Sequence, residues 1–153
     1  MKKFELTTDT KMNLGRKLFR IKALVSFGDV KEGTLGGYVE KEENLDHEGN
    51  AWVYGNAWVY GNACVSGDAR VYGNARVYGN ADYATVKGFG TQCRPTTFFR
   101  CKDRKIRVAC GCFEGTLEEF RKQVKATRTG KIEKEYLMIA DLMELHFEEE
   151  SEE

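Results

Sequence analysis

Proline, long apolar stretches and net charge are all scarce in this sequence, and each shortage excludes a class of protein. One proline stands beside 16 glycines in 153 residues, which excludes collagen-like chains and proline-rich linkers because both need proline together with glycine. No stretch is apolar over the roughly 20 residues that a membrane-spanning helix needs, so no membrane partner is expected. The 24 basic and 24 acidic residues cancel, which argues against a protein that coats nucleic acid.

Export signals and disulfide patterns are missing as well. Lys2 and Lys3 are not followed by the apolar run of a signal peptide, and we therefore expect a cytoplasmic protein. Five cysteines at irregular spacings favour free thiols over a disulfide framework. With 41% hydrophobic residues the chain can still bury a core, which excludes wholesale disorder.

A six-residue repeat occupies the middle of the chain. Its units share the pattern Ala-X-Val-X-Gly-Asn/Asp and begin at five alanines, Ala51, Ala57, Ala63, Ala69 and Ala75. The first four positions suit a short strand with alanine and valine on one side, and glycine allows the positive φ of a turn. Because six residues are too few for a hairpin, each strand is expected to pair with the next coil.

The unit resembles the hexapeptide-repeat family, which forms left-handed parallel β-helices with three units in each coil. The resemblance implies a mainly β fold, with a short left-handed parallel β-helix over residues 39–86. Such a short repeat needs covered ends. We therefore expect a small N-terminal β cap over 1–38, a linker over 87–97, a C-terminal ββαα module for oligomerisation or binding over 98–147, and an acidic tail over 148–153.

The outward residues of the repeat are the main candidates for binding a partner. If units three apart stack, they form four pairs: Trp52 over Arg70, Trp58 over Arg76, Tyr54 over Tyr72, and Tyr60 over Tyr78. Tryptophan, tyrosine and arginine are enriched at binding hot spots, but the same pairs could serve only to stabilise the stacked strands. Both interpretations stay open at this point.

A basic segment with aromatic neighbours follows the repeat. Its cations are further candidates for partner contacts: Arg94, Arg100, Lys102, Arg104, Lys105 and Arg107. The simpler interpretation, which we favour over nucleic-acid binding, is that most of these charges surround the turn of a hairpin. With a two-residue turn, Phe99 would face Val108, and one buried face would hold Phe99, Cys101, Ile106, Val108 and Cys110.

Two helices are predicted after the hairpin. Thr116 and Glu119 form a capping box, and an apolar stripe follows at helical spacing. The second helix begins after Gly130. Its apolar surface is wider than one packing partner requires, so we expect a homodimer that uses the flank Leu137, Leu142 and Leu145.

Catalytic and metal-binding groups are few. Acyltransferases of the hexapeptide family use a histidine base, but His47 and His146 are expected at a core or capping position and at a helix end. Four cysteines are weak zinc candidates without paired C-x-x-C motifs: Cys93, Cys101, Cys110 and Cys112. We therefore expect no enzyme activity, no metal and no cofactor.

The segments at 27–45 and 110–117, together with the repeat, are similar to hexapeptide-repeat proteins of bacteriophages and prophages. This resemblance implies a phage-type binding protein in a bacterial host cell. The leading hypothesis is an inhibitor of a bacterial defence system, comparable to an anti-CRISPR protein, that docks onto a host protein such as a CRISPR nuclease. Two alternatives are a protein that sequesters a nucleotide signal with the Arg94–Arg107 cluster, and a hexapeptide-repeat acyltransferase.

Overall fold

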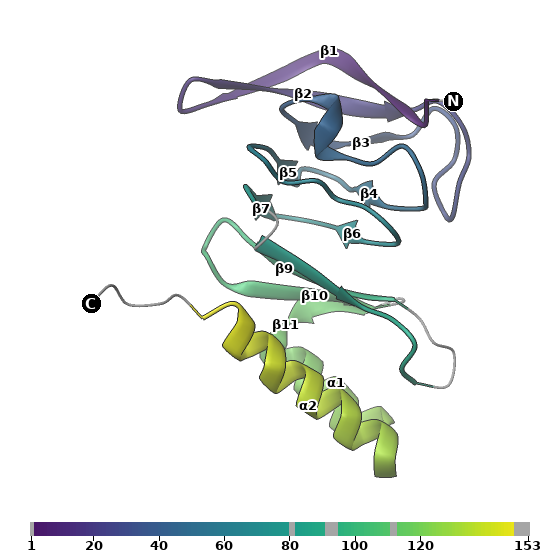
Figure 1. Cartoon of the computed structure of the whole chain (residues 1–153), viewed down its shortest axis with the longest axis vertical. Helices are drawn as coiled ribbons and strands as arrows, with labels where there is room; N and C mark the ends of the chain where they lie inside the picture. The colour runs from purple at the N-terminus through teal and green to yellow at the C-terminus, as the bar shows by residue number, and fades with distance from the viewer. Residues whose placement is uncertain (1, 80–81, 91–94, 111–112, 149–153) are drawn as a thin grey trace.

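A computed structural model of the chain describes residues 2–79, 82–90, 95–110 and 113–148. Its elements follow one another as successive layers from the N-terminus to the C-terminus (Figure 1). A hairpin lies at one end, the repeat comes next, and a four-stranded sheet separates the repeat from two helices at the other end. No helix among the described residues has the length and apolar character required to cross a bilayer.

The largest sheet combines the N-terminal hairpin with part of the repeat. Strand β1 (Phe4–Asn13) pairs antiparallel with β2 (Arg16–Ala23), which pairs antiparallel with β3 (Leu35–Val39). Parallel pairing then continues from β3 to β5 (Trp58–Val59) and from β5 to β7 (Arg76–Val77). We call this five-stranded sheet, in the order β1-β2-β3-β5-β7, the long sheet.

A second side of the repeat carries only two short strands. Strands β4 (Trp52–Val53) and β6 (Arg70–Val71) pair in parallel, and on a third side Leu45, after the 3-10 helix η1 (Glu42–Asn44), forms an isolated bridge with Val65. The expected offset of three units is confirmed for β4 with β6 and for β5 with β7, in which residues 18 apart are partners; in the parallel pair of β3 with β5 the partners are 20 residues apart. The expected positive φ is found at five repeat glycines, Gly49, Gly55, Gly61, Gly67 and Gly73.

The expected fold class is nevertheless wrong. The structure contains a mixed sheet of five strands, a parallel sheet of two, an antiparallel sheet of four and two helices, rather than a closed or solenoid left-handed β-helix. Most repeat strands are two residues long, and the flanking segments supply the longer strands to which they are joined. The anticipated boundary between cap and repeat at 38/39 runs through β3.

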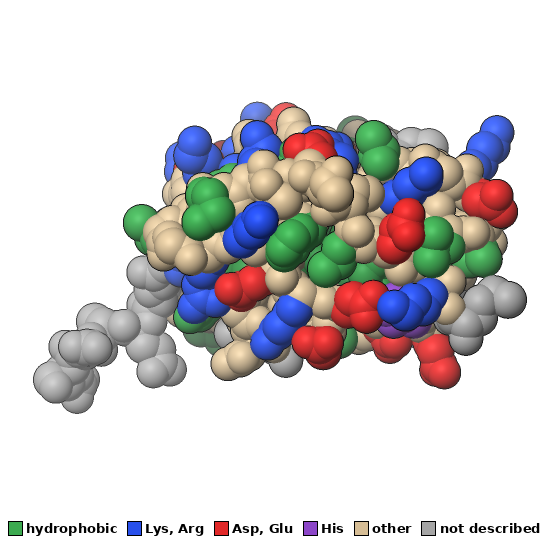
Figure 2. All heavy atoms as spheres, turned by 90° about the horizontal axis from the view of Figure 1, so that it is seen from above, with side chains coloured by type: hydrophobic (Ala, Val, Ile, Leu, Met, Phe, Trp, Pro, Cys, Tyr) green, Lys and Arg blue, Asp and Glu red, His purple; other side chains and the backbone are tan. Residues whose placement is uncertain are grey.

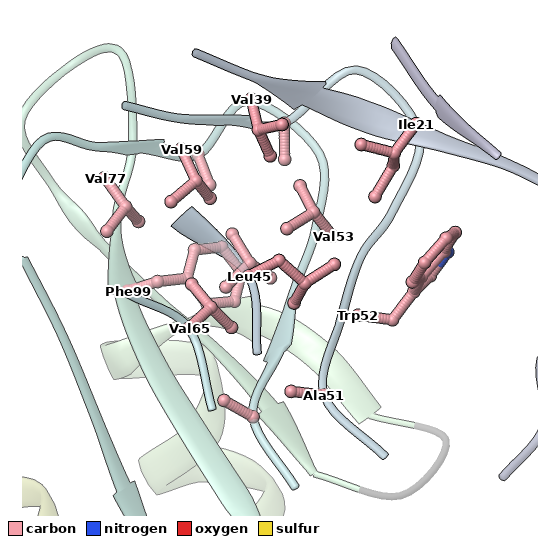
Figure 3. Packing of buried hydrophobic residues seen from close by; sticks show 14 of the residues in the cluster. Ile21, Val39, Leu45, Ala51, Trp52, Val53, Val59, Val65, Val77 and Phe99 are labelled. Carbon is pink, nitrogen blue, oxygen red and sulfur yellow. The ribbon is translucent and has the colours of Figure 1, made fainter. Parts of the chain in front are cut away.

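The core of the repeat is a column of valines with aliphatic and aromatic side chains at its ends. Val39, Val59 and Val77 come from successive strands of the long sheet and are fully buried, as Figure 3 shows. Ile21 of β2 and Phe99 of the next sheet belong to the same cluster. The repeat therefore shares one core with the segments on both sides of it.

The C-terminal sheet is larger than the expected hairpin. It contains β8 (Tyr83–Val86), β9 (Thr96–Arg100), β10 (Ile106–Cys110) and β11 (Phe113–Thr116), all antiparallel, in the order β11-β10-β9-β8. Its first strand belongs to the segment that was assigned to the repeat. The expected ββαα module is thus a ββββαα arrangement.

The predicted register of the β9–β10 hairpin is wrong by one residue. Phe99 pairs with Arg107, and Phe98 pairs with Val108. The turn extends over 101–105 and is therefore longer than the predicted two residues. A shift of one residue in the pairing moves side chains to the opposite face of the sheet. Phe98 and Val108 pack with the helices, whereas Phe99 packs with the repeat.

Two helices joined by a short connection cover the outer face of this sheet (Figure 1). Helix α1 (Leu117–Thr127) begins with the predicted capping box, in which the hydroxyl of Thr116 accepts from the N–H of Glu119 at 3.0 Å. Helix α2 (Gly130–His146) buries Tyr136 and other apolar residues toward the sheet. The helical stripes expected from the sequence therefore form one continuous core with Phe98.

Candidate binding face

Three of the four predicted pairs make side-chain contacts, whereas Trp52 and Arg70 are partners in strand pairing and Arg70 lies over tyrosine rings instead. The rings of Tyr54 and Tyr72 stack with centroids 4.2 Å apart, and those of Tyr60 and Tyr78 meet edge to face at 5.2 Å. The guanidinium of Arg76 lies 3.8 Å from the centroid of the Trp58 ring. The pairs form two ladders: the first contains Tyr54, Arg70 and Tyr72, and the second contains Trp58, Tyr60, Arg76 and Tyr78. Their surroundings differ, and only the second ladder forms an outer face.

Trp52 is not on the surface. Its side chain is 0% exposed and meets the rings of Phe4 and Phe27 edge to face, with centroids 6.4 and 5.4 Å away. The N-terminal segment that covers it is held by Lys3, whose ammonium donates to the carbonyls of Gly49 and Ala51. Trp52 is thus a core residue, and it cannot contribute to a partner-binding surface.

The first ladder is tied to the loop before β3. The Tyr54 hydroxyl donates to Asp29 at 2.9 Å, and Arg70 forms an ion pair with the same carboxylate at 2.9 Å. Arg70 also lies over the rings of Tyr54 and Tyr72. Burial raises the pKa of both tyrosines above the ordinary value. These contacts give Tyr54, Arg70 and Tyr72 a structural role in fixing the loop.

The second ladder forms what we call the aromatic face, which consists of Trp58, Tyr60, Arg76, Tyr78 and Arg16. The first four lie on β5 and β7 or directly after them, and Arg16 reaches down from β2. Arg16 donates to the Tyr78 hydroxyl at 2.9 Å and lies 4.9 Å from its ring centroid. Tyr78 is 49% exposed, and the other three repeat side chains are half-buried.

A second set of contacts fixes the upper edge of the aromatic face. Arg20 lies 4.5 Å from the ring centroid of Tyr38, donates to its hydroxyl at 2.7 Å and pairs with Asp9 at 2.9 Å. Arg16 pairs with Glu40 at 2.8 Å, and that carboxylate also accepts from the N–H of Gly61. The side chains of the face are therefore held in place by one another before any partner binds.

The predicted basic segment is not one cluster. Arg100 is buried and bonded to Asp82 and to the carbonyl of Phe147, whereas Arg107 lies on the other face of the sheet and pairs with Asp103 at 3.3 Å. A cavity of about 340 Å³ beside the turn is lined by Asn74, Cys101, Lys102, Asp103 and Arg107. Lys105 and Arg104 belong to the turn, as predicted, and Arg94 lies outside the described residues.

The cysteines do not assemble a metal site in the part of the chain that the structure describes. Cys101 and Cys110 lie on opposite faces of the sheet and belong to different cores. Cys110 pairs with Thr96 and packs on the helix side, whereas Cys101, the residue after Arg100, packs on the repeat side. Burial raises the pKa of Cys101 to about 11, which keeps the thiol protonated. Cys93 and Cys112 lie outside the described residues, and no group of three ligating side chains occurs among the others.

Both histidine rings take part in packing contacts. His47 stacks on Phe4 with centroids 4.3 Å apart, and its Nδ1 accepts from the N–H of Lys3 at 3.0 Å. His146 meets Phe147 edge to face at 5.0 Å. The structure therefore places His47 in the capping role that its sequence position suggested.

No family model matches the chain, and no curated protein matches it significantly. The aromatic face must therefore be interpreted from its own chemistry.

Two functional candidates were missed in the sequence. Arg16 joins the aromatic face only because β2 pairs beside β3, which no local pattern reveals. Leu14, in the turn between β1 and β2, is 97% exposed and has a φ of +49°. A signal for Leu14 existed, because the dipeptide Leu14-Gly15 stands where a two-residue hairpin turn favours Asn-Gly.

Proposed function

We propose that this chain is a non-enzymatic binding protein that docks onto an acidic surface of a host protein through the aromatic face. The observation that carries the proposal is the mutual fixation of Trp58, Tyr60, Arg76, Tyr78 and Arg16 on a rigid sheet. Tryptophan, tyrosine and arginine dominate binding hot spots. Side chains that are already ordered lose less entropy on binding, so such a face supports affinity at small area.

The charge of the face indicates the chemistry of the partner. Arg16 and Arg20 are balanced by Glu40 and Asp9. Arg76 has no carboxylate partner among the described side chains: its guanidinium donates to the backbone carbonyls of Asn56 and Ala75 and lies over the Trp58 ring. An acidic surface would supply the missing counter-charge and would speed association.

The β1–β2 turn adds an apolar anchor close to the aromatic face. Leu14 precedes Arg16 by two residues, and Met12, on the other side of the turn, is 66% exposed. A left-handed backbone costs a leucine roughly 1–2 kcal/mol, and full exposure of its side chain brings no compensating burial. Strain of this kind is typical of functional positions, and we assign Leu14 to an apolar pocket of the partner.

We further propose that the partner belongs to a bacterial defence system, such as a CRISPR nuclease, and that docking inhibits it by occupying its surface. This part of the proposal is supported by the resemblance of the repeat and its flanks to phage and prophage proteins. The nucleotide-sequestering alternative is less well supported, since Arg100 and Arg107 lie on opposite faces of one sheet.

The proposal is tested by comparing which host proteins are retained by the immobilised wild type and by immobilised variants. The double variant Trp58→Ala, Tyr78→Ala should lose about 2 kcal/mol of partner affinity, or roughly 30-fold, because it removes two aromatic anchors of the face. The control is Tyr72→Ala, which removes a ring from the other ladder. Host proteins retained by the wild type and the control but lost from the double variant are the expected result. Retention by all three, or by none, would refute the proposed face.

Leu14→Asn separates binding from stability. Asparagine tolerates the left-handed conformation and creates the Asn-Gly turn, so we expect the free energy of unfolding to rise by about 1 kcal/mol. Urea denaturation measures the change, and retention of the same host protein is measured in parallel. Weaker binding by a more stable variant is the expected outcome. A variant that is more stable and binds as the wild type does would remove Leu14 from the interface.

A further inference from the structure

Two features of the C-terminal helices lie outside the proposed function. One is the expected dimer flank on α2, where Leu142 and Leu145 are 56% and 67% exposed, whereas Leu137 packs against the core of helices and sheet. Nothing among the described residues shows what covers that flank, and the homodimer stays a prediction. The other is a cavity of about 210 Å³, lined by residues of β10, β11, α1 and α2 at the end of the molecule opposite the β1–β2 hairpin (Figure 1).

Aromatic side chains form the floor of this cavity. Phe113 of β11, Phe120 of α1 and Tyr136 of α2 follow one another with neighbouring ring centroids 6.0 Å apart, at interplanar angles of 56° and 83°. Val124 completes the floor, and the Tyr136 hydroxyl donates to the carbonyl of Phe89 at 3.0 Å. Tilted and edge-to-face contacts are the arrangements that aromatic rings prefer, so a further ring in the cavity would extend the series.

The size of the cavity limits the ligand to one ring with a short side chain. Packed cores contain few spaces larger than a water molecule, so packing alone does not explain a space of about 210 Å³. An apolar cavity of about 150 Å³ holds one benzene molecule. The cavity beside α1 therefore has room for a single ring and a few further atoms.

The rim of the cavity is polar and carries a positive charge. It is formed by Gln123, Thr127 and Arg128, which are all exposed. Arg128 is the C-cap residue of α1 and forms no ion pair with another described residue, whereas Arg121 pairs with two carboxylates of α2. A guanidinium at the mouth of an apolar cavity is suited to a carboxylate, because its planar donors match the two carboxylate oxygens.

The charges near the rim favour an anion as well. Residues 121–131 contain five cations and no carboxylate, namely Arg121, Lys122, Lys125, Arg128 and Lys131. Lys125 already occupies the last turn of α1, where a cation complements the helix dipole. At the hairpin end of the molecule, by contrast, cations and carboxylates are interspersed (Figure 2). The connection between the helices thus places an excess of positive charge beside the cavity.

We infer that this cavity binds a small aromatic carboxylate, with its ring against Phe113, Phe120 and Tyr136 and its carboxylate at Arg128. The ring would displace water from the apolar floor, and Arg128 would donate charge-assisted hydrogen bonds to the carboxylate. The inference goes beyond the proposed function and is independent of it, because the cavity and the aromatic face share no residue.

Titration of the full chain with 3-phenylpropionate, followed by NMR, tests the class of ligand. A probe of this size should bind with millimolar affinity or better. The matched neutral amide and the saturated-ring acid 3-cyclohexylpropionate should each bind about fivefold more weakly, because one lacks the charge and the other lacks the aromatic ring. No binding of 3-phenylpropionate at about 10 mM, or equal binding of either analogue, would overturn the inference.

Substitution of Arg128 tests the contact with the carboxylate. Arg128→Gln should weaken binding of 3-phenylpropionate about fivefold and leave binding of the amide unchanged. The control Lys125→Gln removes a cation from the same helix end at a position that does not line the cavity, so it should change the affinity by less than about twofold. Both positions are exposed, and both variants should fold. Equal losses from the two substitutions would overturn the contact at Arg128.

Cys110 reports whether the ligand occupies this cavity. Its thiol lines the cavity and accepts from the Thr96 hydroxyl at 3.1 Å, whereas Cys64, which is also half-buried, lies on the repeat. Saturating 3-phenylpropionate should slow alkylation of Cys110 by iodoacetamide severalfold and leave alkylation of Cys64 unchanged, as mapped by mass spectrometry. Unchanged alkylation of Cys110 would mean that the acid binds elsewhere and would overturn the inference. These measurements use the purified chain alone, so their failure would leave the binding proposal for the aromatic face intact.

Discussion

Replacing Trp52 with alanine should lower the free energy of unfolding by roughly 3–5 kcal/mol, the cost of removing a large aromatic side chain from a core. Trp52 is 0% exposed, and two aromatic rings of the N-terminal segment pack on it. The cavity left by the indole cannot close easily, because the indole is already tightly enclosed: a Cβ added at Gly36 would lie 2.7 Å from the Trp52 ring. Urea or guanidinium denaturation followed by circular dichroism measures the loss.

Trp58→Ala is the matched control for Trp52. Trp58 occupies the same position in the next repeat unit, but it is half-buried and lies beneath Arg76 at the surface. Its removal should cost clearly less stability and should reduce partner binding. Equal losses from the two substitutions would mean that the N-terminal segment does not cover Trp52 in the way described.

Replacing Arg100 with alanine should have a comparable effect, roughly 3–5 kcal/mol, because it leaves a buried carboxylate without its partner. The side chains of Arg100 and Asp82 are only 9% and 14% exposed, and their atoms are 3.1 Å apart. Arg100 also donates to the carbonyl of Phe147 at 3.0 Å, directly after α2. One guanidinium thus joins the residue before β8, strand β9 and the end of the second helix.

Arg107→Ala provides the comparison for Arg100→Ala on the neighbouring strand. Arg107 pairs with Asp103 in a contact whose side chains are 31% and 46% exposed, so its loss should change stability little. Thermal denaturation of both variants, at equal ionic strength, distinguishes the two sites. A small effect of Arg100→Ala would show that the ion pair at Asp82 does not hold the C-terminal layers together.

The repeat made part of the fold predictable from sequence, because its period encodes which residues become neighbours. The pairing of Trp52 with Arg70 and of Trp58 with Arg76 followed directly from three units of six residues. The fold class did not follow, since periodicity carries no information on how the flanks pair. Strands of two residues were incorporated into a sheet whose longest members, β1 and β2, lie outside the repeat.

The functional residues were predictable to the extent that they depend on local spacing. The ladder of Trp58, Tyr60, Arg76 and Tyr78 needed only the period. The burial of Trp52 needed contacts with Phe4 and Phe27, which are 48 and 25 residues away in the sequence. Arg100 was misjudged for a similar reason, because its partners Asp82 and Phe147 come from two other elements.

The 18-residue offset between paired strands has a consequence for how the gene can change in length. Each of the paired repeat strands rests on the strand three units away, with Val53 on Val71 and Val59 on Val77. A duplication or deletion of one unit would keep the alternation of inward and outward residues but would move every later side chain to a different side. Only changes in multiples of three units would lengthen or shorten the stack while preserving the ladders. Tandem duplications that persist in this gene are therefore expected to comprise 54 nucleotides or a multiple of that length, three for each of the 18 residues.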